Sequence, residues 1–227
     1  APVTIAVFPC NNCINKGLIK NKNSCFCCFL TFVNGQHCIK SEICIIKIQI
    51  MSVTKWLLDP AHSELSFKIR HMMIANVLGV FKSFKASIEA EGEEFKQAKI
   101  SASVDVNSIF TNNADRDTHL KSADFFDAAS FPQMVFEALQ FEQKSSGNYT
   151  LAGNLTIKNI TKSITLDVEC GGILKDPYGN IKAGFSFTGK LNRKDWGLNW
   201  NATLESGAVL VSDEVRLMGD LQFVKSQ

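Results

Sequence analysis

From residue 64 onward, apolar and polar side chains alternate with a period of two along most of the chain. Leu65, Phe67, Ile69 and His71 would share one face of an extended strand, and the polar residues between them the other. The same period recurs in runs that cover residues 84–91, 100–107, 149–157, 164–170, 185–191 and 215–223. Residues 134–141 are apolar in both phases, which is typical of a strand covered on both sides. The pattern predicts about eight or nine strands, mostly antiparallel.

That many amphipathic strands in one domain must close into a barrel or stack as a sandwich. An eight-stranded barrel can be just wide enough to hold one small ligand. The apolar phases mix bulky Phe and Leu with small residues, namely Ala86, Ala102, Gly153, Gly189 and Gly219. Small residues among large ones can leave a lumen, but they also suit a tapering packed core. Periodicity alone leaves both interpretations open.

Two stretches break the alternation, and two others carry turn signals. Residues 71–78 and 117–126 lack the period of two, so we expect short helical turns inserted in the sheet. The segments 144–148 and 176–180 are rich in Gly, Asn, Ser, Asp and Pro, which favours tight connections between strands.

Composition changes sharply at Met51. Residues 1–50 hold seven of the eight cysteines, with five Lys and one Glu, and contain no Met, Trp or Arg. Residues 51–227 keep a single cysteine, Cys170, which offers no disulfide framework and is typical of a reducing compartment. We therefore divide the chain into residues 1–50 and a folded domain of residues 51–227.

Four interpretations of residues 1–50 compete. The segment resembles translated A/T-rich sequence upstream of a start at Met51, which would make it non-native. It could also be a processed leader, although its apolar run lacks a clean cleavage site. The third interpretation is a zinc site formed by Cys10-x-x-Cys13 and the later cysteines, and the fourth is a disulfide role. A single C-x-x-C pair is a poor signal for zinc. We expect this segment to be disordered and leave it out of the fold argument.

Charge and motifs exclude several functional classes. The chain carries 24 basic and 22 acidic residues, which argues against a nucleic-acid binder driven by bulk charge. No apolar stretch reaches the roughly 18 residues that an integral membrane helix needs. Nucleotide-binding, zinc-protease and serine-hydrolase signatures are missing from the sequence. No resident cofactor or metal site is predicted for the folded domain.

Specific motifs do stand out between Trp56 and Phe223. The most distinctive block is Arg116-Asp-x-His119-Leu followed by Asp124-Phe-Phe-Asp127. With it come segments in matching order and spacing: Trp56–Ser63, Arg70–His71, Gly79–Phe81, Phe131–Phe136, Gly153–Lys158, Thr161–Lys162, Gly184–Phe185, Asn192–Leu198 and Asp213–Val215. In these motifs the chain resembles the YceI-like family of lipocalin-like proteins. Residues 1–50 fall wholly outside the resemblance.

The resemblance implies an all-β fold with short helices: a closed antiparallel eight-stranded lipocalin-like β-barrel with an elongated apolar pore. It implies a small-molecule lipid ligand, a prenyl quinone or polyprenyl phosphate, carried or sequestered without catalysis by a homodimer. A start at Met51 would lead directly into the first strand, so we expect a cytoplasmic protein, or a periplasmic one if residues 1–50 contain a leader. The candidate ligand-binding residues are Phe67, Ile69, His71, Phe84, Ile88, Val104, Arg116, His119, Phe125, Phe136, Leu155, Leu166, Phe185, Phe187 and Trp196.

Polar residues in these motifs also permit other roles. His119 with Asp117 would suit a general base and its partner, but two residues two apart on a helix do not face each other. We therefore expect the block around Arg116 mainly to hold a connection against the barrel. His71 is expected to be a hydrogen-bonded core histidine or a ligand contact. The rival functions are an enzyme acting on such a lipid and a stress-related interaction module with an incidental cavity.

Overall fold

The computed structural model describes residues 53–91, 95, 98–203 and 209–226, together with four short strands within residues 1–50. The chain divides into two compact units, Ala1–Met51 and Ser52–Gln227. In the first unit, β1 (Ser24–Cys25) pairs with β4 (Ile46–Lys47), and β2 (Thr31–Val33) pairs with β3 (Gln36–Cys38). The other expectations for residues 1–50 lie outside the described residues.

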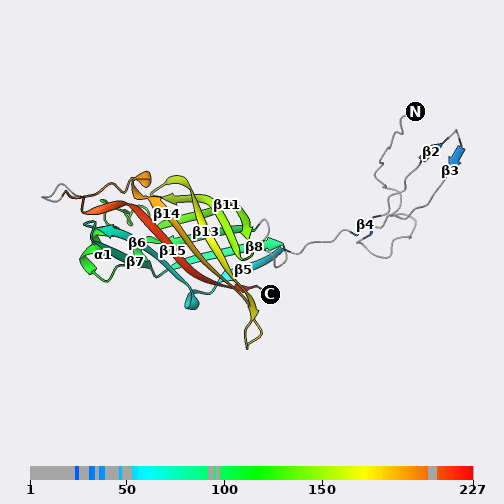
Figure 1. Ribbon diagram of the computed structural model, residues 1–227, viewed down its shortest axis with the longest axis horizontal. Coiled ribbons are helices and arrows are strands. Elements are labelled where there is room, and N and C mark those ends of the chain that lie inside the picture. The colour runs from blue at the N-terminus through cyan, green and yellow to red at the C-terminus, as the bar shows by residue number, and fades with distance from the viewer. Residues whose placement is uncertain are drawn as a thin grey trace. The chain divides into compact units, whose positions relative to one another are not determined.

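Eight antiparallel strands form a closed ring within the described part of the second unit (Figure 1). In ring order from β15 they are β15 (Val211–Lys225), β14 (Ile181–Asn192), β13 (Ile160–Lys175), β12 (Asn148–Ile157), β11 (Gln133–Ser145), β9 (Lys99–Asp105), β8 (Phe84–Glu91) and β5 (Val53–Leu58). The ring closes because the end of β15 pairs with β5, with Phe223 opposite Leu58. The predicted closed eight-stranded barrel is confirmed.

Three further strands extend the sheet at one end of the ring. The first part of β15 pairs with β6 (Glu64–His71), which pairs with β7 (Ala75–Phe81), which pairs with β10 (Ile109–Phe110). The helical turn expected at residues 71–78 is therefore wrong. Residues 72–74 form a tight turn, and a strand follows at once. The period of two was hidden because apolar residues occupy both phases of β7, with Val77 half-buried and Leu78 exposed.

Short helices occupy the connections. The 8-residue α1 (Ala114–Lys121) confirms a helix in the first part of the range 117–126, where helical turns were expected, and it begins three residues earlier. Asn113 caps it, its Oδ1 accepting from Arg116 N at 2.9 Å. Residues 53–226 also contain, where they are described, the 3₁₀ turns η2 (Pro60–His62), η3 (Val106–Ser108) and η4 (Arg193–Trp196). The hairpin connections expected at 144–148 and 176–180 are present as turns.

A stack of aromatic rings fills the end of the barrel where β5 closes the ring. Trp56 lies 5.3 Å from Phe95, Phe95 lies 5.1 Å from Phe185, and Phe185 lies 5.9 Å from Phe223, between ring centroids. All four side chains are buried, and Trp56 is 0% exposed. Edge-to-face and tilted contacts of this kind add to the free energy of area burial. The stack forms an aromatic floor across the barrel interior.

An ion-pair cluster fastens the chain beside this floor. The Asp59 carboxylate accepts from His62 Nδ1 at 2.9 Å and from Lys182 Nζ of β14 at 3.2 Å. Burial alone would raise the pKa of Asp59, but the hydrogen bonds from His62 and Lys182 outweigh it and leave that pKa lowered. The cluster thus links the β5–β6 connection to β14, which lies on the other side of β15 from β5.

Glycines allow large inward rings to lie flat against neighbouring strands. A Cβ at Gly153 would lie 2.5 Å from the Phe136 ring and 2.6 Å from the Glu137 carbonyl oxygen. A Cβ at Gly219 would similarly meet the Phe187 ring at 2.4 Å. The rings of Phe136 and Phe187 pack against the glycine backbone of a neighbouring strand. Because they therefore project less far into the barrel, space is left in its interior.

We expect Gly153→Ala to lower the free energy of unfolding by about 1–3 kcal/mol, because the new methyl group overpacks against the Phe136 ring and a fixed backbone oxygen. Urea unfolding followed by circular dichroism measures the change. Gly184→Ala in β14 is the matched control, since a Cβ there meets nothing within 4 Å. Equal stabilities of the two variants would contradict the close-approach explanation.

Candidate functional site: an apolar cavity in the barrel

A cavity of about 520 Å³ lies inside the barrel, lined mainly by apolar side chains from the ring strands and from β6 and β7. The two alternatives left open by periodicity, lumen or packed core, are therefore decided in favour of a lumen. Most of the candidate residues lie in its lining: Phe67, Ile69, His71, Phe84, Val104, Arg116, His119, Phe125, Phe136, Leu155, Leu166 and Phe187.

The structure places the other three candidates, Ile88, Phe185 and Trp196, outside the lining. Ile88 lies opposite Trp56 across β5 and β8, and Phe185 belongs to the aromatic floor. Trp196 is 1% exposed in η4, and its indole Nε1 donates to the Leu155 carbonyl oxygen at 3.0 Å. All three are buried as packing residues. Alternation cannot distinguish Ile88 and Phe185 from lining residues because both kinds face inward, whereas Trp196, expected at the rim of the mouth after a strand, packs in a 3₁₀ turn instead.

Sequence reasoning missed several lining residues. Val215, Leu217 and Leu221 of β15 line the cavity, although their strand shows the same alternation as the chosen ones. Trp200 also lines it, from the irregular segment after η4, where no periodic signal exists. The alternation of β15 therefore predicts its lining residues, whereas the position of Trp200 depends on tertiary contacts that the sequence pattern does not contain.

Titratable side chains gather at the end of the cavity opposite the aromatic floor. His119 lies in α1, and its ring centroid is 4.7 Å from that of Trp200 and 5.1 Å from that of Phe125. Its Nε2 lies 3.1 Å from Asp124 Oδ2. The His119 side chain keeps 37% of its surface exposed, unlike the residues of the floor. The α1 end is thus more exposed to solvent than the floor, and we call it the entrance of the cavity.

A buried hydrogen-bond network fixes α1 at this entrance. The Thr111 amide and hydroxyl both donate to Asp117 Oδ1, at 2.8 and 2.6 Å. Arg116 in turn donates from Nε to Thr111 Oγ1 at 2.7 Å and from Nη2 to the Thr111 carbonyl oxygen at 2.6 Å. The expected structural role of this block matches these contacts, and Asp117 bonds Thr111 instead of His119.

His71 lies half-buried at the end of β6, in the cavity lining. Its imidazole forms no hydrogen bond with any other described residue, so the hydrogen-bonded core histidine that we expected is not found there. His71 thus contributes to the cavity lining and has no hydrogen-bond partner among the described residues.

Arg193 organises the irregular segment that carries Trp200. Its guanidinium is 2% exposed and donates to the carbonyl oxygens of Leu198, Trp200 (2.8 Å) and Ser212 (3.0 Å). Burial lowers the pKa of Arg193 from its ordinary value, while the Asp213 carboxylate opposes that shift. Arg193 is thus committed to the protein backbone, although it also borders the cavity.

Within the described part of the chain, no three His, Cys, Asp or Glu side chains are placed to hold a metal ion together. The metal site considered for the cysteines of residues 1–50 lies outside the described side chains. None of the helices described there has the length and apolar character needed to cross a membrane.

The geometry agrees with comparisons to known proteins. The YceI-like domain family model matches residues 56–223, the span from the aromatic floor to the last strand. This chain belongs to the YceI-like domain family. A UPF0312 protein of Staphylococcus aureus strain N315 is 38% identical over 176 residues, which cover 77% of this chain and 100% of that protein.

Solved YceI-like structures share the barrel. The YceI protein of Campylobacter jejuni is 33% identical, with a TM-score of 0.60 over 70% of this chain and 90% of its own. BcnA of Burkholderia cenocepacia is 22% identical, with a TM-score of 0.62 over 73% and 98%. A polyisoprenoid binding domain from Saccharophagus degradans is 14% identical, with a TM-score of 0.52 over 75% and 98%. The last two likenesses concern the fold.

Replacing Arg193 by Met should lower the free energy of unfolding by at least about 2 kcal/mol, because several buried carbonyl oxygens each lose a donor at about 1–3 kcal/mol. Chemical unfolding measures the loss. Lys194→Met is the control, since the exposed Lys194 Nζ pairs with Asp213 at 2.9 Å and is expected to contribute about 1 kcal/mol or less. A pair of variants with the same stability would contradict this role for Arg193.

Proposed function

We propose that the barrel binds a long-chain isoprenoid amphiphile, with its prenyl tail in the cavity and its polar head at the α1 end, and carries or sequesters it unchanged. The observation that supports this most is the polarity of the cavity along its length. Phe223, which belongs to the buried aromatic floor, lines one end, whereas Arg116, His119 and His71 line the other. A ligand apolar throughout except at one end matches that arrangement.

The energetics favour a hydrocarbon tail. A cavity of about 520 Å³ falls within the range of about 300–1,000 Å³ usual for small-molecule sites. Burial of an apolar chain contributes about 25 cal/mol per Å² without needing directional contacts. The fold is also that of the polyisoprenoid binding domain from Saccharophagus degradans, which is compatible with an isoprenoid as the ligand.

The charged side chains that line the cavity itself, which do not include Lys68, Arg70 or Arg216, favour a neutral head over a phosphate. Arg193 and two donors of Arg116 are already engaged with the protein. Asp115 lies in the lining, and Asp124 lies next to His119, so carboxylates would oppose a second anion. A quinone carbonyl oxygen needs one or two donors. The His119 Nε2 already faces the Asp124 carboxylate, whereas His71, which has no hydrogen-bond partner among the described residues, lines the cavity and can provide a donor. We therefore favour a prenyl quinone over a polyprenyl phosphate.

An enzyme acting on the same lipid is the rival function, with His119 as the base. It differs from the carrier in one measurable way. Substitution of His119 by Ala would abolish turnover of a bound isoprenoid in an enzyme but would change only affinity in a carrier. Incubation of the protein with a prenyl quinone, followed by chromatography of the recovered lipid, distinguishes the two.

We expect Ala102→Phe to weaken prenyl quinone binding at least tenfold, because Ala102 lines the cavity and an added ring would occupy the volume of the tail. Quenching of tryptophan fluorescence on titration with the quinone measures the affinity, since Trp200 borders the cavity. Ser101→Phe is the control, because Ser101 lies exposed on the opposite face of β9. Unchanged affinity in a folded Ala102→Phe protein would contradict binding in the barrel.

A further inference from the structure

The turn between β6 and β7 exposes three consecutive apolar side chains. Met72, Met73 and Ile74 have 38%, 54% and 80% of their surface exposed. Leu78 of β7, opposite Lys68 of β6, is also 51% exposed. We call residues 72–74 the apolar turn. Contiguous exposed apolar surface of this kind marks an interaction site, whereas single exposed residues do not.

Backbone geometry shows that this turn is poorly suited to stability. Met72 and Met73 have φ values of 50° and 62°, in the left-handed region that favours Gly and Asn. Hairpin turns with positive φ ordinarily carry Asn-Gly or Asp-Gly. Here two methionines adopt that conformation and point into solvent. Stability explains neither their strained backbone nor their exposure, so a role outside folding is the better explanation.

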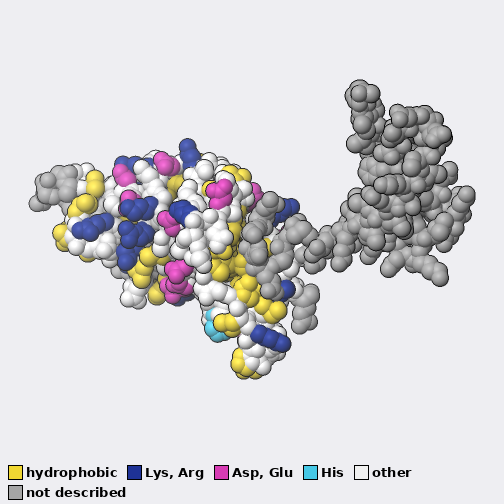
Figure 2. Space-filling model, turned by 45° about the vertical axis from the view of Figure 1, so that its right-hand side comes forward, with side chains coloured by type: hydrophobic (Ala, Val, Ile, Leu, Met, Phe, Trp, Pro, Cys, Tyr) yellow, Lys and Arg dark blue, Asp and Glu magenta, His cyan; other side chains and the backbone are white. Residues whose placement is uncertain are grey.

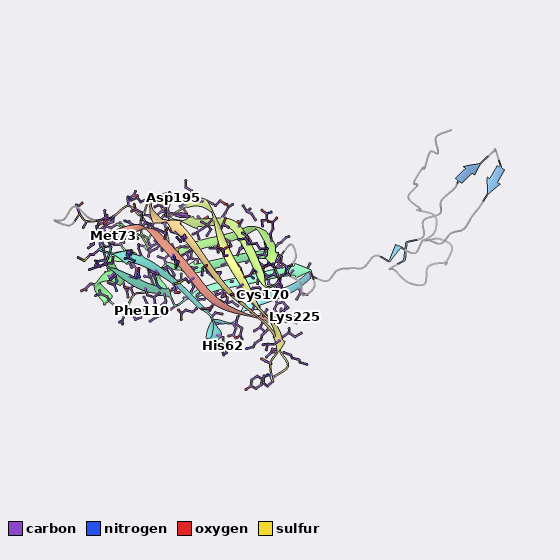
Figure 3. The ribbon with its side chains drawn as sticks, in the orientation of Figure 1. His62, Met73, Phe110, Cys170, Asp195 and Lys225 are labelled. Carbon is purple, nitrogen blue, oxygen red and sulfur yellow. The ribbon has the colours of Figure 1, made fainter. Side chains whose placement is uncertain are left out.

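The apolar turn adjoins the entrance of the cavity. The Met72 amide donates to the Leu210 carbonyl oxygen at 2.8 Å, and His71 pairs with Val211 across β6 and β15. His71, Leu210 and Val211 all line the cavity. Figure 3 shows Met73 at the end of the barrel where α1 lies, away from His62 and Lys225.

Positive charge accompanies the apolar turn. Lys68 and Arg216 lie opposite each other on β6 and β15, and Arg70 Nε donates to the Met73 carbonyl oxygen at 3.0 Å. No described carboxylate forms an ion pair with these three cations. The acidic pair Glu64 and Asp220 lies on the same two strands but toward the floor. Figure 2 shows Lys and Arg side chains beside hydrophobic ones at this end of the barrel.

We propose that the apolar turn inserts into the surface of an anionic lipid bilayer. Lys68, Arg70 and Arg216 would then face the phosphate head groups, and the cavity entrance would lie against the membrane. Apolar insertion and attraction of basic residues to anionic lipid together determine binding strength at such interfaces. This inference rests on the proposed function, since it gives the prenyl ligand a route between bilayer and cavity that avoids water.

Flotation of the full chain with vesicles of phosphatidylcholine, with or without phosphatidylglycerol, tests the proposal. We expect binding to the anionic vesicles that weakens as salt is raised. The double variant Met72→Asn/Met73→Gly should bind at least tenfold more weakly while unfolding at the same or a higher temperature, because the turn strain is relieved. Lys68→Gln/Arg216→Gln should lose about fivefold per removed cation, on anionic vesicles only.

Leu174→Asn is the matched control, because Leu174 is 64% exposed on β13, outside the turn and its cationic neighbours. It should leave vesicle binding unchanged. Wild-type protein that does not float, or a turn variant that floats as well as wild type, would overturn the proposal. So would a turn variant that fails to float but changes from dimer to monomer in sedimentation, since the turn would then join two copies of the chain.

Prenyl quinone titration of the same turn variant in detergent separates this proposal from the proposed function. Unchanged quinone affinity with lost flotation supports both. Intact quinone binding by a wild-type protein that does not float overturns membrane docking alone. Flotation without quinone binding leaves docking supported and contradicts the proposed ligand.

Discussion

The pairing of one edge of β15 with two different strands, β6 and then β5, is the constraint on which the rest of the structure depends. Its first part pairs with β6, and its last residues pair with β5. One strand therefore both closes the ring and holds the three further strands, β6, β7 and β10, at the entrance. Closure removes the free sheet edges that an open sheet would expose. It also encloses a space whose two ends are built differently, aromatic at the floor and titratable at the entrance. The site follows from that asymmetry.

Much of this fold could be predicted from the sequence, because strand alternation is local. The runs that become β6, β8, β9, β12 and β14 have the period of two, and the hairpin turns carry their expected residues. The lumen could not be predicted, because it depends on which residue lies beside Gly153 or Gly219 in the neighbouring strand. The same limit applies to Ile88 and Phe185, since inward-facing residues near the floor and those along the lumen share one phase.

Family membership and cavity shape support the same class of ligand from independent directions. The family model spans the barrel and leaves out residues 1–50, which is where composition also changes. Cytoplasmic location and a homodimer stay predictions. Thr111, Arg116 and Asp117 form the polar network that holds α1 in place, which gives the most distinctive motif of the sequence a structural role. His119 and His71 also line this end of the cavity, so in our proposal they lie nearest the polar head of the ligand.

The most direct test of the account is the content of the cavity after native purification. The full chain, purified without detergent, would be extracted with organic solvent and the extract analysed by mass spectrometry. The account predicts a prenyl lipid in near-stoichiometric amount, present in the Ser101→Phe protein and depleted in Ala102→Phe. An extract without bound lipid, together with failure of the purified protein to take up added prenyl quinone or polyprenyl phosphate, would contradict it.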